Sequence, residues 1–129
     1  MKRIALVTAA AAAALTAAFA LPQAEAAAAA APCFRSSQVA NTRPDGDQTL
    51  YVRAAGNRYF RLDMKEPCNG LDGSLGPLVI EPVGSNLICK PLDAELTIVS
   101  HGVSQRCRIA TITPLSRDEV AALPRRVQP

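Results

Sequence analysis

The residues of this chain with the best-defined chemistry are its four cysteines, Cys33, Cys68, Cys89 and Cys107. Protein thiols bind zinc, exchange electrons as closely spaced pairs, or form structural disulfides. Zinc and redox sites usually contain a Cys-x-x-Cys pair, and no two of these cysteines lie that close. The chain also has one histidine only. The spacing therefore predicts two structural disulfides, with no metal and no cofactor held by these thiols.

Four cysteines allow three disulfide connectivities. The favoured one is nested, with Cys68–Cys89 inside Cys33–Cys107. It would join the first strand to the last and clamp the loop between Cys68 and Cys89. The other two connectivities remain open at this point.

No catalytic constellation is expected. His101 has Ser100 and Ser104 nearby, but Ser-His-Gly is typical of a turn and the sequence has no Gly-x-Ser-x-Gly elbow. The Gly-rich stretch 69–76 lacks the Gly-Lys-Ser/Thr of a phosphate loop, and 45–47 is too short for a calcium loop. We therefore expect a protein that is not an enzyme and that has no catalytic residue and no metal ligand.

Two surfaces are candidates for binding. The loop from Cys68 to Pro77 is long and would be tethered by a disulfide. Exposed aromatic and basic side chains form the second candidate, with an ordinary solvated sheet face as the alternative. The residues of this second patch are Tyr51, Arg53, Tyr59 and Arg61.

The N-terminus has the pattern of a secretory signal peptide spanning residues 1–26. Lys2 and Arg3 precede an uncharged stretch from Ile4 to Leu21, and the small residues of Ala24-Glu25-Ala26 suit a cleavage site. An uncleaved membrane anchor is the alternative. Residues 27–32 are expected to be a disordered leader, and Pro32 is unfavourable for lipidation of Cys33. This pattern predicts a bacterial protein that is periplasmic or secreted.

The charge balance excludes some partners. The formal net charge is +3, and the basic residues are scattered. That balance is too weak to favour nucleic acid or anionic lipid, and no stable membrane insertion is expected after cleavage of the signal. An unknown envelope protein or ligand remains as the expected partner.

The clearest secondary-structure signal is a β-hairpin over residues 48–64. Apolar residues alternate with polar ones on both sides of Gly56-Asn57. A two-residue loop would place Val52 opposite Arg61 and so mix the two faces of the sheet. A three-residue loop, 55–57, places Val52 opposite Phe60, with Gly56 or Asn57 at positive φ.

The remaining elements are short. We expect strands over 78–81, 87–90, 95–100 and 106–113, with turns over 41–47 and 101–105. Ser116 and Glu119 form a capping box for a helix over 117–123, and 124–129 reads as a tail. Residues 33–123 are thus expected to form a single disulfide-stapled domain. Its fold class is mainly β, a small antiparallel β-sandwich or barrel with a short C-terminal helix.

Several cysteine-containing motifs resemble a bacterial family of small exported four-cysteine proteins, a domain of unknown function. The matching motifs are Cys33-Phe34, 67–71 (Pro-Cys-Asn-Gly-Leu), 87–89 (Leu-Ile-Cys) and 106–110 (Arg-Cys-Arg-Ile-Ala), within about residues 33–115. Members commonly have Gly-Asp soon after the third cysteine, where this chain has Lys90-Pro91. The resemblance implies export and disulfides and supplies no catalytic residues.

Two functions are compatible with these features. The first is a non-enzymatic binding module of the cell envelope. The alternative is an inhibitor of an envelope or foreign hydrolase such as a lysozyme, which would present a rigid protruding loop.

Overall fold

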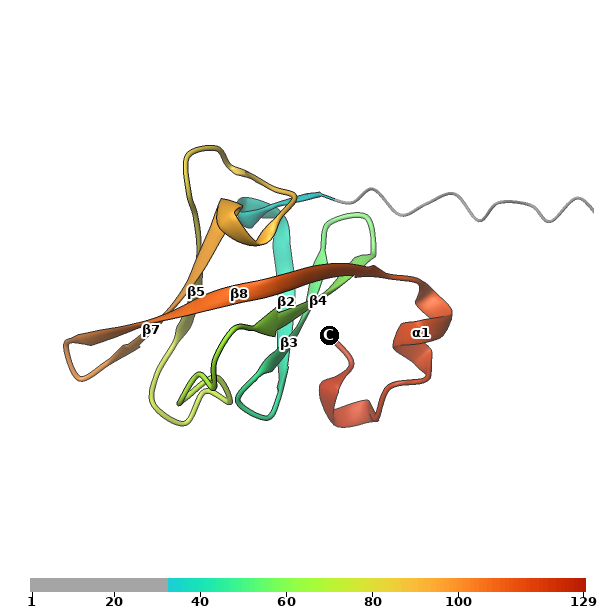
Figure 1. The fold of residues 1–129 in the computed structure, drawn as a ribbon. Coiled ribbons are helices and arrows are strands. Elements are labelled where there is room, and N and C mark those ends of the chain that lie inside the picture. Colours follow the sequence, from blue (N-terminus) through green and yellow to red (C-terminus); the bar gives the residue numbers. More distant parts are fainter. Residues whose placement is uncertain (1–32) are drawn as a thin grey trace, which may run out of the picture.

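The computed structural model describes residues 33–129 and shows a curled antiparallel sheet (Figure 1). The predicted signal peptide, 1–26, and leader, 27–32, lie outside the described residues. Among the residues that are described, no helix is long and apolar enough to cross a membrane.

The main sheet has six strands in the order β2-β3-β4-β8-β7-β5, and neighbouring strands are antiparallel. It curls into a half-barrel in which β2 and β5 are the two free edges. The strands are β2 (Val39–Asp45), β3 (Thr49–Ala54), β4 (Arg58–Met64), β5 (Leu78–Pro82), β7 (Ala94–Ser100) and β8 (Val103–Leu115). The mainly β fold class predicted from the sequence is confirmed.

Strand β8 turns the sheet from one half of the barrel to the other. It is 13 residues long, and its first half pairs with β7 while its second half pairs with β4. Ala110 is the extra residue of a bulge near the start of the half that pairs with β4, because Thr111 pairs with Asp63 and Ile109 with Met64. Bulges increase local twist and bend a strand, which suits this position.

A second sheet of two short strands covers one end of the half-barrel. It pairs β1 (Phe34–Arg35) with β6 (Leu87–Ile88), and it places Phe34 opposite Ile88. Both side chains are fully buried, and the Phe34 ring centroid lies 4.7 Å from that of Phe60. The sequence prediction extended β6 to Lys90, two residues too far.

The β3–β4 hairpin has the predicted register. Leu50 pairs with Leu62 and Val52 with Phe60, and Ala55-Gly56-Asn57 forms the three-residue loop. Both Gly56 (φ 76°) and Asn57 (φ 53°) have positive φ. The alternation of apolar side chains thus determined the register, since any one-residue slip would expose the buried face.

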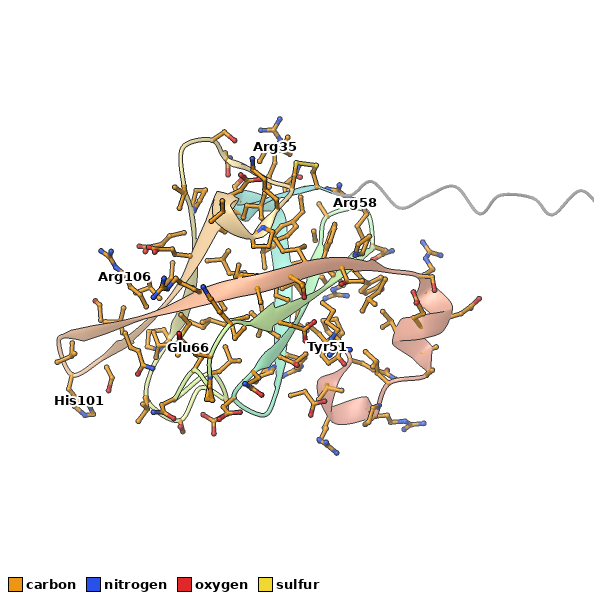
Figure 2. All side chains as sticks on the ribbon, viewed as in Figure 1. Arg35, Tyr51, Arg58, Glu66, His101 and Arg106 are labelled. Atoms are coloured by element: carbon orange, nitrogen blue, oxygen red, sulfur yellow. A yellow bond between two sulfur atoms is a disulfide. The ribbon has the colours of Figure 1, made fainter. Side chains whose placement is uncertain are left out.

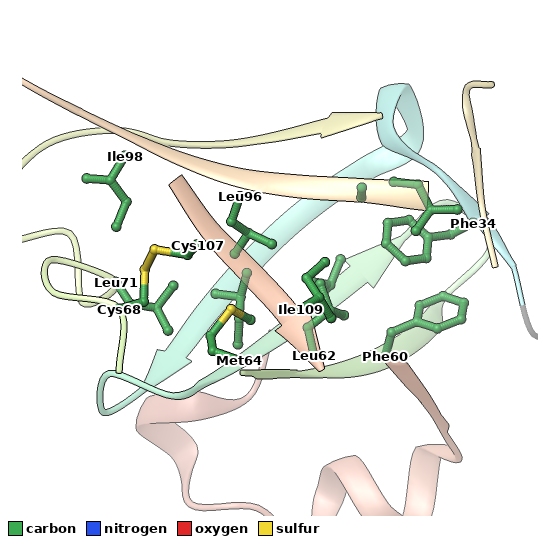
Figure 3. Packing of buried hydrophobic residues seen from close by; sticks show 14 of the residues in the cluster. Phe34, Phe60, Leu62, Met64, Cys68, Leu71, Leu96, Ile98, Cys107 and Ile109 are labelled. Atoms are coloured by element: carbon green, nitrogen blue, oxygen red, sulfur yellow. A yellow bond between two sulfur atoms is a disulfide. The ribbon is translucent and has the colours of Figure 1, made fainter. Parts of the chain in front are cut away.

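The core fills the concave side of the half-barrel (Figure 3). Phe34 and Phe60 lie at one end of it, and the Cys68–Cys107 disulfide lies with Leu71 at the other end. Leu62, Met64, Leu96 and Ile109 occupy the space between these ends. The other disulfide, Cys33–Cys89, includes the residue next to Phe34, so each disulfide lies near one end of the same core.

The nested disulfide pairing predicted from the sequence is wrong. The structure joins Cys33 to Cys89 and Cys68 to Cys107, so that the two bridges interleave along the chain. Pairing of Phe34 with Ile88 brings Cys33 beside Cys89. The hydrogen bond from Lys65 N–H to the Arg108 carbonyl, 2.8 Å, holds the segment that leads to Cys68 against β8. Two disulfides are typical of an oxidising, non-cytoplasmic location.

The predicted turn over 41–47 is largely a strand. Strand β2 continues through Pro44 to Asp45, and the turn is confined to residues 46–48. Proline is compatible with β2 because this strand lies at an edge of the sheet. The predicted turn over 101–105 also contracts, to His101-Gly102 between β7 and β8.

The C-terminal helix begins as predicted. Helix α1 (Arg117–Ala121) has the Ser116–Glu119 capping box, with Glu119 N–H donating to Ser116 Oγ at 3.2 Å. Residues 33–129 also contain the 3-10 helices η1 (Ser36–Gln38), η2 (Pro91–Asp93) and η3 (Arg125–Val127).

Residues 124–129 are packed against the domain and do not form a tail. Helix η3 lies against β2, and Arg126 pairs with Asp45 at 3.3 Å. Val127 is 1% exposed. The ordered domain therefore continues beyond the predicted boundary at residue 123.

Candidate binding groove

The two free edges of the half-barrel face each other across a groove. Its volume is about 410 Å³, which lies within the range of small-ligand sites. Strand β2 and helix η1 line one wall, and β5 lines the other. The lining residues are Ser36, Val39, Ala40, Asn41 and Thr42 on the first wall and Leu78, Val79 and Ile80 on the second.

The β2 wall is built so that its edge offers few backbone donors. Ala40 is the extra residue of a bulge between the pairs Val39–Ala54 and Asn41–Arg53. The Asn41 side chain accepts a hydrogen bond from Thr42 N–H at 2.9 Å, and Pro44 has no N–H. Bulges, proline and side-chain caps are the means by which proteins prevent an edge strand from pairing. Strand β2 is therefore a protected edge.

The β5 wall has the opposite character. Val99 N–H donates to the Pro77 carbonyl at 3.2 Å, and Val83 N–H donates to the Asp93 carbonyl at 2.8 Å. These two bonds fix the alternation along β5, so that Val79 faces β7 with its N–H and C=O. The backbone groups of Leu78 and Ile80 consequently point away from β7, toward the groove. Among the described residues, no hydrogen bond satisfies them.

The floor of the groove is the margin of the hydrophobic core. Val39, Leu78 and Ile80 are partly buried side chains that pack against the core, and all three line the groove. None of the described residues that line it carries a charge. The groove can therefore take an uncharged, partly apolar group, and a charged group would lose hydration there without a partner.

One end of the groove is held by side-chain hydrogen bonds. Ser36 Oγ donates to Asn86 Oδ1 at 2.6 Å, and Asn86 Nδ2 donates to Ser37 Oγ at 3.2 Å. These bonds join η1 to the segment before β6, next to the Cys33–Cys89 disulfide. The end of the groove is thus anchored by a covalent bridge and does not depend on loop conformation.

The predicted binding loop, from Cys68 to Pro77, forms a separate surface. Its base is fixed because the Cys68–Cys107 disulfide and the Leu71 side chain are buried. At its tip Ser74 N–H donates to Asp72 Oδ1 at 3.0 Å, and hydrogen bonds from Ser74 lower the pKa of the Asp72 carboxyl. A recess of about 290 Å³ lies between this loop and the β2–β3 turn. The structure does not bring this loop to the groove, because no residue of 68–77 is among those that line it.

The predicted aromatic and basic patch is only partly exposed. The register pairs Tyr51 with Arg61 and Arg53 with Tyr59, as expected. Tyr51 is nevertheless 6% exposed, and in Figure 2 it lies on the side of the sheet toward the C-terminal segment. Arg61 donates to Asp63 at 2.9 Å, and this hydrogen bond raises the pKa of the Arg61 guanidinium.

The side chains that were considered for catalysis and set aside lie apart from one another. His101 is at the exposed tip of the β7–β8 hairpin (Figure 2), where it has positive φ (47°). Its Nδ1 lies 2.9 Å from Ser100 Oγ, and no described carboxylate forms an ion pair with it. Asp118 and Glu119 belong to the start of α1, where hydrogen bonds from Ser116 lower the pKa of the Glu119 carboxyl. In residues 33–129 no three potential ligands gather around a metal position.

The groove was not predicted from the sequence. Its walls come from strands separated by the whole β3–β4 hairpin and the 65–77 segment, so no local pattern marks it. The available signals were the prolines of β2 and β5, Pro44 and Pro82, because proline within a strand indicates an edge.

Comparison with known proteins identifies the family of this chain and no individual relative. No curated protein and no solved structure matches the chain. The model of a family of unknown function, DUF6491, matches residues 1–127. This match covers nearly the entire sequence, and the chain therefore belongs to the DUF6491 family of unknown function.

Proposed function

We propose that this protein is a non-enzymatic binding domain of the bacterial envelope, periplasmic or secreted, and that it binds an uncharged ligand or protein segment in the groove between β2 and β5. The observation that carries the proposal is the open groove between β2 and β5. The half-barrel does not close, and the groove between its two edges leaves Val39, Leu78 and Ile80 only partly buried, beside the unpaired backbone groups of Leu78 and Ile80.

The disulfides support the proposed location. Two bridges stabilise a small core that has no Trp and few aromatic residues, and such bridges persist where the environment is oxidising. The basic start and uncharged stretch at the N-terminus supply the export signal in this proposal. Neither nucleic acid nor the membrane interior is the proposed partner.

Filling the groove tests this function. Ala40 is exposed, lines the groove and is unpaired at a bulge, so Ala40→Trp should fill it without disturbing the core. Ala110 is exposed at the bulge of β8 and gives a matched control, Ala110→Trp. Each variant is titrated with the neutral apolar dye N-phenyl-1-naphthylamine, and fluorescence is recorded.

We expect saturable dye binding by the wild type and by Ala110→Trp, and binding at least tenfold weaker by Ala40→Trp. Equal binding by all three proteins would show that the dye does not use the groove, and the proposal would then lose its support.

The alternative function is inhibition of an envelope or foreign hydrolase by the Cys68–Pro77 loop. The specific observation in its favour is the rigid base of this loop, which is held by Cys68–Cys107 and the buried Leu71. An inhibitor should abolish muramidase activity at a stoichiometric ratio, and Asp72→Ala at the loop tip should weaken that effect. Unchanged muramidase activity at a tenfold excess of the protein would eliminate lysozyme as the target.

A further inference from the structure

We infer that the groove binds an extended, uncharged polypeptide segment, which pairs as an added strand with the free edge of β5. This inference rests on the proposed function and specifies its ligand. The argument comes from the backbone of β5, the protection of β2, the size of the groove and its lack of charge.

The free groups of β5 have the repeat of a β-strand. Leu78 and Ile80 each present an N–H and a C=O toward the groove, and Val79 between them faces β7. Two residues of a strand span about 6.6–6.8 Å, so these donors and acceptors recur at that interval. An extended peptide offers complementary groups at the same spacing, whereas a sugar or lipid does not.

The opposite wall disfavours regular strand pairing on both sides of an inserted segment. Strand β2 is bulged at Ala40, Thr42 N–H is already bonded to Asn41, and Pro44 lacks a donor. An inserted strand would thus find both donors and acceptors on β5, whereas Thr42 and Pro44 of β2 supply no free donor. This asymmetry assigns the pairing edge to Leu78 and Ile80.

The size of the groove limits the occupant to a single segment. A packed strand residue occupies about 160 Å³, estimated from strand rise, strand spacing and sheet spacing. A groove of about 410 Å³ then holds two to three residues, which matches the span from Leu78 to Ile80. A second folded copy of the chain is disfavoured, because β2 stands across the groove from the edge that the copy would need.

The lining residues select an uncharged segment. The walls offer Ser36, Asn41 and Thr42 as polar groups and Val39, Leu78 and Ile80 as apolar ones, with no charged side chain among them. A segment that alternates hydroxyl-bearing and aliphatic residues complements this lining. A Lys or Glu at its centre would be desolvated without an opposite charge.

The experiment uses the full mature chain labelled with 15N and a pool of capped pentapeptides. Positions two and four of the pool are Val, Ile or Leu, and the other positions are Ser or Thr. A second pool is N-methylated at its three central residues, which removes backbone donors but keeps the side chains. Amide hydrogen exchange and chemical shifts are followed by NMR at millimolar peptide.

We expect the first pool to slow exchange at the Leu78 and Ile80 amides at least tenfold and to leave Val79 unchanged. The N-methylated pool should have no such effect. Slowed exchange in the 68–77 loop alone, equal effects of the two pools, or no effect of either pool would overturn the inference.

A pair of variants tests the hydrogen bond directly. Ile80→Ala shortens the side chain and keeps the N–H, whereas Ile80→Pro also removes the N–H that points into the groove. Loss of one hydrogen bond should make peptide binding by Ile80→Pro about three- to tenfold weaker than by Ile80→Ala. Equal affinities would show that this donor is not used.

The dye titration distinguishes failure of the peptide inference from failure of the proposed binding function. If Ala40→Trp loses dye binding while no peptide binds, the groove is a binding site for another uncharged ligand, and only the peptide inference fails. If no peptide binds and Ala40→Trp also leaves dye binding unchanged, both proposals fail.

Discussion

Gly76→Ala should destabilise the protein by displacing the start of β5, the wall of the groove. A methyl group on Gly76 would overlap the carbonyl oxygen of Val99, which is backbone and cannot rotate away. The 76–77 segment must then move, and the hydrogen bond from Val99 N–H to the Pro77 carbonyl is lost.

The size of the effect follows from two costs. Gly76 has φ 155°, in a region that residues with a Cβ rarely adopt, and holding alanine there costs about 1–3 kcal/mol. The lost hydrogen bond adds about 0.5–1.5 kcal/mol. The sum, about 1.5–4.5 kcal/mol, corresponds to a fall in Tm of at least about 6 °C for a domain of this size.

Gly73→Ala is the matched control. Gly73 also has positive φ, 82°, but a Cβ there would contact nothing. It therefore carries a backbone cost of about 1–2 kcal/mol only. Both substitutions reduce the entropy of the unfolded chain equally, so this effect cancels in the comparison.

Urea unfolding of the oxidised proteins, followed by circular dichroism, measures the difference. Because both positions carry a similar backbone cost, Gly76→Ala should be less stable than Gly73→Ala by about 0.5–1.5 kcal/mol, the contribution of the lost hydrogen bond. If the two variants unfold at the same urea concentration, Gly76 does not approach Val99 and the position of β5 is incorrect.

Three further predictions concern the disulfides and the C-terminal segment. Non-reducing peptide mapping should find Cys33 joined to Cys89, and recovery of a Cys33–Cys107 peptide would contradict the fold. A mild reductant should open the Cys33–Cys89 bridge first, because Cys89 is exposed while Cys68 and Cys107 are buried. Ser116→Ala should cost about 0.5–2 kcal/mol and raise the Glu119 pKa only in part, as measured by NMR titration, because it removes the Ser116 hydroxyl but keeps the Ser116 N–H that donates to the Glu119 carboxyl. Because the folded-state pKa of Glu119 is lowered, its stabilising effect is present above the ordinary pKa and is lost as pH falls through the lowered value; an unchanged pKa in the variant would refute the capping interaction. Val127→Ala should lower the unfolding free energy by about 1–2 kcal/mol, because two buried methyl groups are removed; a change below about 0.3 kcal/mol would mean that the C-terminal segment is not docked.

The part of the fold that was predictable from the sequence is the part with one buried face. In the β3–β4 hairpin, Leu50, Val52, Phe60 and Leu62 alternate with polar residues, and the burial of that face allows one register only. The capping box of α1 was equally readable, because Ser116 and Glu119 interact within one turn.

The disulfide pairing was not predictable by the same reasoning. It depends on the pairing of β1 with β6, which are two residues long and have no periodicity. The position of Cys33 beside Cys89 follows from the contact of Phe34 with the core, a tertiary effect that no local pattern encodes.

The groove was hidden for a related reason. Pro44 lies within a cluster of turn-forming residues, so most of β2 was interpreted as a turn, and without β2 one wall of the groove is missing. The chain was therefore expected to form a sandwich or barrel without any indication of where it remains open. The prediction of an exposed Tyr51 failed similarly, because Tyr51 is buried on the side of the sheet toward the C-terminal segment (Figure 2), whose last residues were interpreted as a tail.

Amide hydrogen exchange of the free protein tests most directly whether the groove edge of β5 is unpaired. In β5 the N–H groups of Leu78 and Ile80 are unpaired, whereas that of Val79 is bonded to β7. We predict that Leu78 and Ile80 exchange at least tenfold faster than Val79. Equal protection of all three amides would mean that β5 is already paired on both sides, and the groove would then not be available to any ligand.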